Sequence, residues 1–190
     1  MKRILIQSDT MFFIAAAVFI LIIAVIVIFA FPQFSPIPYF PSNMHDMPII
    51  LQALHLNNGQ TVFDLGAGDG VVIFKAALAA KEKNLNTYFV AVEINPILIC
   101  ILHIRRMLHP NRANIRIVWG DLFKLDYSRF VSKNNSVTAY LYVTPRLIPS
   151  ILDAVHTSVG RFTAVSYYYS LSKEMKPTYK GIHSVFVKVM

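Results

Sequence analysis

The sequence predicts an α/β protein with a mostly parallel sheet, preceded by one long apolar segment. Two observations predict the sheet. Short apolar runs alternate with helix-like stretches beyond residue 47, and a glycine-rich stretch, VFDLGAGDG at 62–70, stands where a strand should pass into a helix. A third observation sets the start of the chain apart, because residues 11–31, MFFIAAAVFILIIAVIVIFAF, carry no charge.

Residues 11–31 are expected to form a transmembrane helix. At 1.5 Å per residue they give about 31 Å of helix, which matches a hydrocarbon core of about 30 Å. A signal peptide is the alternative, with Lys2 and Arg3 as its basic region, but the apolar run is long and IFA is a poor cleavage site. The expected organisation is a tail over 1–10, the transmembrane helix over 11–31, a linker rich in proline and aromatic residues over 32–46, and the main domain over 47–190.

The elements of the main domain follow from its hydrophobic periodicity. A short helix is expected over 46–56, with Asp46 as its N-cap and Pro48 in its first turn. Strands are expected near 61–65, 88–92, 115–118, 137–142 and 162–168, and helices near 71–82, 96–108 and 147–157. The final SVFVKVM is expected to be a last strand, paired with residues near 178–181. Apolar strands separated by helices indicate a parallel sheet covered on both faces.

The composition limits the chemistry. Cys100 is the one cysteine, so an internal disulfide is excluded. Eighteen Lys and Arg against ten Asp and Glu give a net charge of +8, and Arg105 and Arg106 form the tight basic pair after the apolar segment. A solvated basic surface is the simplest interpretation, with anionic lipid and nucleic acid as the general alternatives. Cys100 and His103 are interpreted as packing and surface residues, and the histidines show no metal spacing, so no metal is expected.

The glycine-rich stretch places a turn between the first strand and the next helix. Such a turn puts backbone amides and a helix N-terminus at the carboxyl edge of the sheet, where open α/β folds bind ligands. Gly66, Gly68 and Gly70 let the chain turn sharply and approach a ligand closely. Val71 stands where a dinucleotide-binding fingerprint would have glycine. A tight corner without a ligand is the alternative.

Two carboxylates are expected at the same edge of the sheet. Glu93 ends the second strand in VAVEINP, where it would accept both ribose hydroxyls, and Asp121 ends the third strand in WGDLF, where it would accept from an exocyclic amine. Each carboxylate also has an interpretation without a ligand. Glu93 would then be a charge at a helix N-terminus, and Asp121 would be a turn residue. Their coincidence with the glycine turn favours a nucleoside ligand.

The motifs DLGAGDG, EINP and GDLF resemble the first three motifs of class I S-adenosylmethionine-dependent methyltransferases. The resemblance implies a Rossmann-like sheet of seven strands with the last antiparallel, and S-adenosylmethionine as cofactor. It implies that the methionine part lies among Asp64, Gly66, Gly68 and Gly70, that Glu93 binds the ribose, and that the adenine lies beside Asp121, Leu122 and Phe123. Asp69 is expected to hold the ammonium group of the cofactor, with a helix N-terminal charge as the alternative.

The layout as a whole is similar to a narrower family, the small membrane-anchored protein-lysine methyltransferases. Its mitochondrial members modify the ATP synthase c-subunit and the adenine nucleotide translocase. The shared features are the hydrophobic segment, PYFPSN before the domain, DLGAGDG, E-x-N-P, YLYVTP after the fourth strand and a short C-terminus that ends in a strand. The chain departs from the family at Val71, where members often carry a basic residue. The resemblance implies a membrane-anchored protein-lysine N-methyltransferase that acts on a membrane protein.

Residues beyond the fourth strand are the candidates for catalysis. Methyl transfer to an amine needs alignment and an unprotonated nucleophile. Tyr142, Thr144 and Pro145 are the candidates, because carbonyls there would orient an amine and Tyr142 would accept or relay its proton; packing at the strand end is the alternative for Tyr142. Tyr39, Phe40 and Ser42 are expected to close the pocket from the other side. The run YYY at 167–169 is interpreted as the end of the fifth strand, with substrate stacking as the lesser alternative.

Other functions stay open at this stage. They are methylation of a lipid or quinone-like molecule, methylation of RNA, and a catalytically silent membrane-bound module that binds the cofactor. Two features predict opposite membrane orientations. Lys2 and Arg3 precede the apolar segment and favour a domain outside the cell, whereas the cofactor is kept inside the cell. The cofactor argument is preferred. The expected protein is therefore a single-pass membrane protein with a cytoplasmic catalytic domain, with the lipid bilayer as partner and nucleic acid disfavoured.

Overall fold

The computed structural model describes residues 2–30, 40–132 and 135–190, with side chains for 11–26 and throughout the two later ranges. The chain divides into two compact units, Met1–Pro38 and Tyr39–Met190.

The first unit contains one helix, α1, which spans Lys2–Ala30 and so includes most of the expected tail. Its described side chains, residues 11–26, are almost all exposed and apolar. Among the residues that the structure describes, no helix has the length and apolarity to span a bilayer. The transmembrane helix over 11–31, the bilayer as partner and the single-pass localisation are corrected by this finding.

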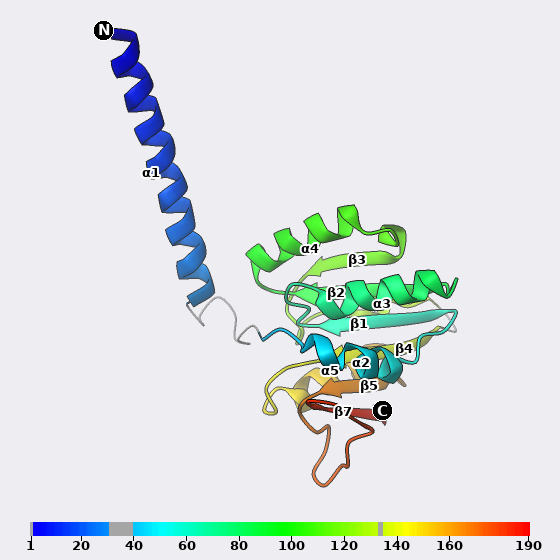
Figure 1. The fold of residues 1–190 in the computed structure, drawn as a ribbon. Helices are drawn as coiled ribbons and strands as arrows, with labels where there is room; N and C mark the ends of the chain where they lie inside the picture. Colours follow the sequence, from blue (N-terminus) through cyan, green and yellow to red (C-terminus); the bar gives the residue numbers. More distant parts are fainter. Residues whose placement is uncertain (1, 31–39, 133–134) are drawn as a thin grey trace. The chain divides into compact units, whose positions relative to one another are not determined.

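The second unit is built on a seven-stranded sheet of order β3-β2-β1-β4-β5-β7-β6. Its strands are β1 Gln60–Leu65, β2 Thr87–Glu93, β3 Ile115–Trp119, β4 Ser136–Leu141, β5 Thr163–Tyr167, β6 Tyr179–Lys180 and β7 Ser184–Val189. The first five pair in parallel, and β7 is antiparallel to both β5 and β6. The arrowheads of the parallel strands end at one edge of the sheet (Figure 1). The predicted Rossmann-like sheet with an antiparallel last strand is confirmed.

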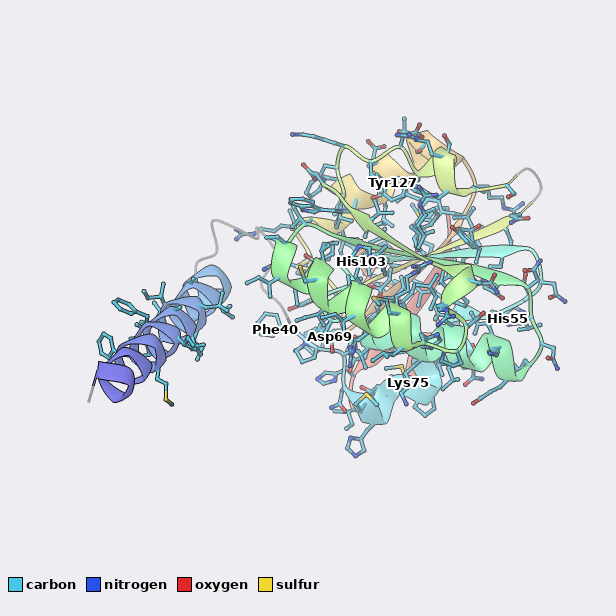
Figure 2. All side chains as sticks on the ribbon, turned by 90° about the horizontal axis from the view of Figure 1, so that it is seen from above. Phe40, His55, Asp69, Lys75, His103 and Tyr127 are labelled. Carbon is cyan, nitrogen blue, oxygen red and sulfur yellow. The ribbon has the colours of Figure 1, made fainter. Side chains whose placement is uncertain are left out.

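The helices of this unit are α2 Met47–Leu54, α3 Val71–Glu82, α4 Pro96–Leu108 and α5 Ile148–Val159, with short 3-10 turns η2 Met44–Asp46, η3 Arg112–Asn114 and η4 Tyr127–Phe130. The bounds of α3 and α4 are those predicted. Asn95 caps α4 by accepting from the amides of Ile97 and Leu98. Cys100 and His103 lie exposed on α4, as expected, and Figure 2 labels His103 on this helix.

Alternate strand residues face two helical layers. Val62 and Tyr140 belong to one core with residues of α2, α3 and α4. Phe63 points to the opposite face, where its ring lies 5.3 Å from that of Tyr127 in η4, and α5 packs against η4 there. Because β1 is buried along its whole length, its neighbourhood is open to ligands at the strand ends and not along the faces.

Asp46 precedes α2 but does not cap it. Its backbone is helical and its side chain makes no cap hydrogen bond, although Pro48 stands in the first turn as expected. Its carboxylate accepts instead from Tyr167 and His183, which belong to the far end of the chain. The N-cap prediction was therefore wrong, because tertiary donors replace the local amides.

Candidate cofactor and acceptor site

The glycine-rich turn joins β1 to α3 at the carboxyl edge of the sheet. The Gly66 amide donates to the Val92 carbonyl at 3.0 Å, which holds the turn against β2. Gly66, Gly68 and Gly70 all have left-handed φ values, of 81°, 59° and 80°. A Cβ on Gly70 would also lie 2.5 Å from Leu102 Cδ2. Glycine at 70 is therefore required by both backbone conformation and space.

Glu93 is aimed at the glycine turn. Its Oε2 accepts from the Gly68 amide at 2.8 Å, and its Oε1 accepts from the amides of Ile94 and Asn95, each at 2.9 Å. A carboxylate offers about four acceptor positions, so these three amides leave room for one further donor. The buried Glu93 thus organises the turn and can still accept from one hydroxyl at the edge.

Asp121 lies one strand further out. The Gly120 amide donates to the Glu93 carbonyl at 3.0 Å, which ties the end of β3 to the end of β2. The Asp121 carboxylate accepts from the Phe123 amide at 2.9 Å, a turn contact that holds it at the edge. Leu122 is buried, whereas the ring of Phe123 is 38% exposed. Phe123 is therefore the residue of the two that presents an apolar surface at this edge.

Asp64 and Asp69 have different environments. Burial, followed by repulsion from Glu93 and Asp69, raises the pKa of Asp64 to about 8, so this carboxyl is neutral at pH 7. Asp69 is charged and paired: its Oδ2 lies 2.7 Å from Arg105 Nη1, and its Oδ1 accepts from the Val71 amide. Arg105 also donates to the Asp69 carbonyl. The sequence showed Arg105 only as part of a basic pair and did not reveal that this residue of α4 pairs with Asp69.

Tyr142, Thr144 and Pro145 follow β4 and lie beside the turn. Val143 between them is buried, and its Cγ1 lies 3.8 Å from where a Cβ on Gly66 would stand. The stretch that carries the three candidate residues thus approaches the glycine turn at Val143, and Pro145 is exposed.

Tyr142 belongs to an aromatic cluster with Tyr167, Tyr168 and Tyr169. Its ring centroid lies 4.9, 6.3 and 6.4 Å from theirs, respectively. Tyr168 has a left-handed φ of 74°, which ends β5 and turns the last two tyrosines toward Tyr142. Burial, then the neighbouring Tyr169 and Tyr168, raises the pKa of Tyr142. Its phenol therefore keeps its proton at neutral pH.

The segment before α2 reaches the same end of the sheet through Ser42. Ser42 Oγ and Tyr140 Oη are 2.8 Å apart and buried. Phe40 is exposed, and Tyr39 lies outside the described residues. Figure 2 shows Phe40 and Asp69 toward one end of the domain and His55 toward the other.

Comparison with known proteins supports the methyltransferase fold. The chain matches 93% of an RNA methyltransferase from Salinibacter ruber, solved with S-adenosyl-L-homocysteine, over 79% of its own length, with 18% identity and a TM-score of 0.65. It also matches a precorrin-6y C5,15-methyltransferase from Geobacter metallireducens (19% identity, 67% of this chain, 62% of that one, TM-score 0.52) and the 23S rRNA methyltransferase ErmE (18%, 68% and 48%, TM-score 0.51). The chain has the class I methyltransferase fold.

Sequence similarity covers a smaller region. The chain is 35% identical over 81 residues to a protein of Methanosarcina mazei named "Probable ribosomal RNA small subunit methyltransferase A", over 43% of this chain and 27% of that protein. A protein of the same name from Methanosphaera stadtmanae is 29% identical over 82 residues, 43% of this chain and 28% of that protein. The chain thus spans about a quarter of the length of these relatives. No protein-family model matches it.

These findings agree with the predicted enzyme class and with S-adenosylmethionine as cofactor. They do not support the narrower resemblance to membrane-anchored protein-lysine methyltransferases, because both sequence relatives are named as ribosomal RNA methyltransferases. The expectation that disfavoured nucleic acid as a partner is corrected for the same reason.

Proposed function

We propose that this chain is an S-adenosylmethionine-dependent methyltransferase that acts on RNA. The observation that carries the methyltransferase part is the Glu93 carboxylate on the Gly68 amide, at the edge where β1, β2 and β3 end. The RNA part is supported by the similarity to proteins named as rRNA and RNA methyltransferases. The net charge of +8 agrees with a polyanionic substrate. We assign the catalytic domain to residues 47–190, as predicted.

The cofactor supplies a methyl group on a sulfonium. The residues proposed to hold it are Asp64, Gly66, Gly68, Asp69, Gly70, Glu93, Asp121, Leu122 and Phe123. Gly68 and Gly70 keep side chains away from the edge, and the remaining acceptor position of Glu93 takes a ribose hydroxyl. Arg105 already pairs with Asp69. The Asp69 carboxylate is therefore proposed to contact the ammonium group of the cofactor while it stays paired with Arg105.

The acceptor is proposed to lie over Tyr142. A flipped nucleobase has an apolar face and polar edges, so it needs an aromatic ring to stack on and hydrogen-bond partners at its rim. The cluster of Tyr142, Tyr168 and Tyr169 offers the rings. Thr144 and the Tyr142 phenol offer acceptors that orient a nitrogen and take its hydrogen bond. The Thr144 carbonyl already accepts from the Leu147 amide, which fixes the loop that carries them.

The test is a labelling experiment with the full chain. The purified protein is incubated with methyl-tritiated S-adenosylmethionine and either total RNA or ribosome-free protein extract from the cells that make it. Nuclease-sensitive label in the RNA arm is expected. Glu93→Ala should abolish it, whereas Asp126→Asn, a capping aspartate at η4, should leave it unchanged. Cofactor binding without label in either arm would contradict the proposal.

A protein lysine is the second candidate. The same three tyrosines would attract an ammonium group through their ring faces, an interaction of about 0.5–2 kcal/mol. The site would then have to favour the free amine, because an unperturbed lysine is mostly charged at neutral pH. Protease-sensitive label on lysine in the protein arm, with none in RNA, would select this candidate over the first.

A further inference from the structure

Asp46 is buried and holds together segments that are far apart in the sequence. Its Oδ2 accepts from the Tyr167 hydroxyl at 2.7 Å and from the His183 amide at 2.9 Å, and its Oδ1 accepts from the Ile182 amide at 2.7 Å. The His183 ring contributes through Nδ1, 3.3 Å from Oδ2. The carboxylate thus joins the entry to α2, the end of β5 and the turn between β6 and β7.

The turn between β6 and β7 is shaped to receive this carboxylate. A Cβ on Gly181 would collide with Asp46 Oδ1 and would lie 2.8 Å from Ile49 Cδ1. Successive amides that point into one concavity form an anion-binding site. Burial by itself would raise the pKa of Asp46, but the hydrogen bonds from Tyr167, His183 and Ile182 outweigh it, and the pKa lies below its ordinary value. Asp46 is therefore a buried, charged acceptor with all its donors on other elements.

Both side-chain partners of Asp46 contact the aromatic cluster. The Tyr167 ring meets the Tyr142 ring edge to face, 4.9 Å between centroids at 80°. The His183 ring lies 5.0 Å from the Tyr168 ring. The Tyr168 amide donates to the Ser184 carbonyl at 2.8 Å, which holds its left-handed backbone. The bonds to Asp46 thus fix two rings, each of which packs on a different tyrosine of the acceptor end.

We propose that Asp46 is a positioning residue for the acceptor site, acting through Tyr167 on Tyr142 and through His183 on Tyr168. The inference rests on the proposed function, in which Tyr142 receives the acceptor. A ring that is off by about 1 Å loses productive alignment, and such misplacement reduces rates on the order of a hundredfold. Loss of the Asp46 contacts should therefore impair the acceptor and leave the cofactor edge intact.

The first test separates the acceptor from the cofactor. Asp46→Asn and Tyr167→Phe are expected to lower kcat/KM for RNA at least tenfold. The cofactor Kd should stay within twofold of wild type, measured from the fluorescence of Trp119, the one tryptophan, at the end of β3 beside Glu93. Asp126→Asn is the matched control, because Asp126 also accepts several hydrogen bonds, two from Ser128 and one from Ser158. An equal weakening of cofactor binding in Asp46→Asn would show a merely structural role and overturn the inference.

The second test asks whether Asp46 acts through Tyr142. In a Tyr142→Ala background, Asp46→Asn should lose most of its effect on kcat/KM, because contacting residues in one network are not additive. Full additivity of the two substitutions would overturn the route through Tyr142. If Asp46→Asn does not fold, Tyr167→Phe carries the test alone, since it keeps the Asp46 bonds to the amides of Ile182 and His183.

The third test needs no acceptor. In protein labelled with ¹³C on the tyrosine rings, the signals of Tyr142 and Tyr168 should shift or broaden in Asp46→Asn and stay unchanged in Asp126→Asn. Unchanged signals in Asp46→Asn would overturn the inference, whatever the substrate. Failure of the proposed function is distinct, because it appears as an absence of labelled RNA with the wild-type protein.

Discussion

Gly70 is the position where the shape of the glycine turn is most sharply testable. Alanine there must keep a φ of 80° and fit a Cβ 2.5 Å from Leu102 Cδ2 and 2.7 Å from Phe74 Cε2. The left-handed backbone costs about 1–2 kcal/mol. Displacing two packed side chains adds about 1–3 kcal/mol. Gly70→Ala is therefore expected to lower the free energy of unfolding by about 2–5 kcal/mol.

Gly59→Ala is the matched control for this prediction. Gly59 has a φ of 66°, but a Cβ there would meet Asn135 Oδ1 at an ordinary 3.5 Å. Only the backbone part remains, about 1–2 kcal/mol. Both variants are compared with wild type by urea unfolding, followed by far-ultraviolet circular dichroism. Equal losses in the two variants would refute the argument that close packing of Leu102 and Phe74 demands glycine at 70.

Three further predictions concern ionisable residues of the site. Glu93→Ala removes the carboxylate that accepts from the Gly68 amide and is proposed to accept from a ribose hydroxyl. Loss of the charge-assisted bond to the hydroxyl, about 1.5–3 kcal/mol, should raise the cofactor Kd about 10–100-fold in calorimetry, and a change below threefold would contradict the assigned role. With a folded-state pKa of about 8 against an ordinary 3.8, the Asp64 carboxyl binds its proton more tightly in the folded state, so the contribution of Asp64 to stability should fall as pH rises from 4 to 8. Asp64→Asn should remove this slope, by up to about 1.4 kcal/mol per pH unit in urea unfolding at several pH values, and a variant with the wild-type slope would disprove the shift. Arg105→Ala breaks the partly exposed pair with Asp69 and should cost less than about 1 kcal/mol in the same assay; a larger loss is not compatible with a solvent-screened pair.

Most of the fold was predictable because its signals are local. α3 begins after Gly70, and α4 begins at Pro96 after its cap Asn95, so each signal lies at the start of its helix. The expected strands agree with the structure to within a residue or two at each end, since each is a short apolar run between helices. Asp46 is the exception. It looks like a local cap, yet its donors come from residues more than 100 positions away.

The candidate site was predictable in the part that strand register decides. Carboxyl ends of neighbouring parallel strands meet at one edge, so Glu93 had to approach the turn that contains Gly68. The pairing of Arg105 with Asp69 was not predictable, because it depends on how α4 packs beside α3. Substrate stacking by residues 167–169 was only a lesser alternative in the sequence, because the geometry of the aromatic cluster depends on the left-handed backbone of Tyr168. Hydropathy alone also predicted a membrane span over residues 11–31, whereas no helix among the described residues has the length and apolarity of one.

By itself, the sequence determined the order of strands and helices, the glycine turn and the carboxylates at the strand ends. These follow from periodicity, backbone freedom and chain direction, which are properties of neighbouring residues. Only the tertiary structure decided which charges are paired, which carboxyl is neutral and which tyrosine rings contact one another. Those properties depend on burial and on contacts across dozens of residues, and a pattern read along the chain does not contain them.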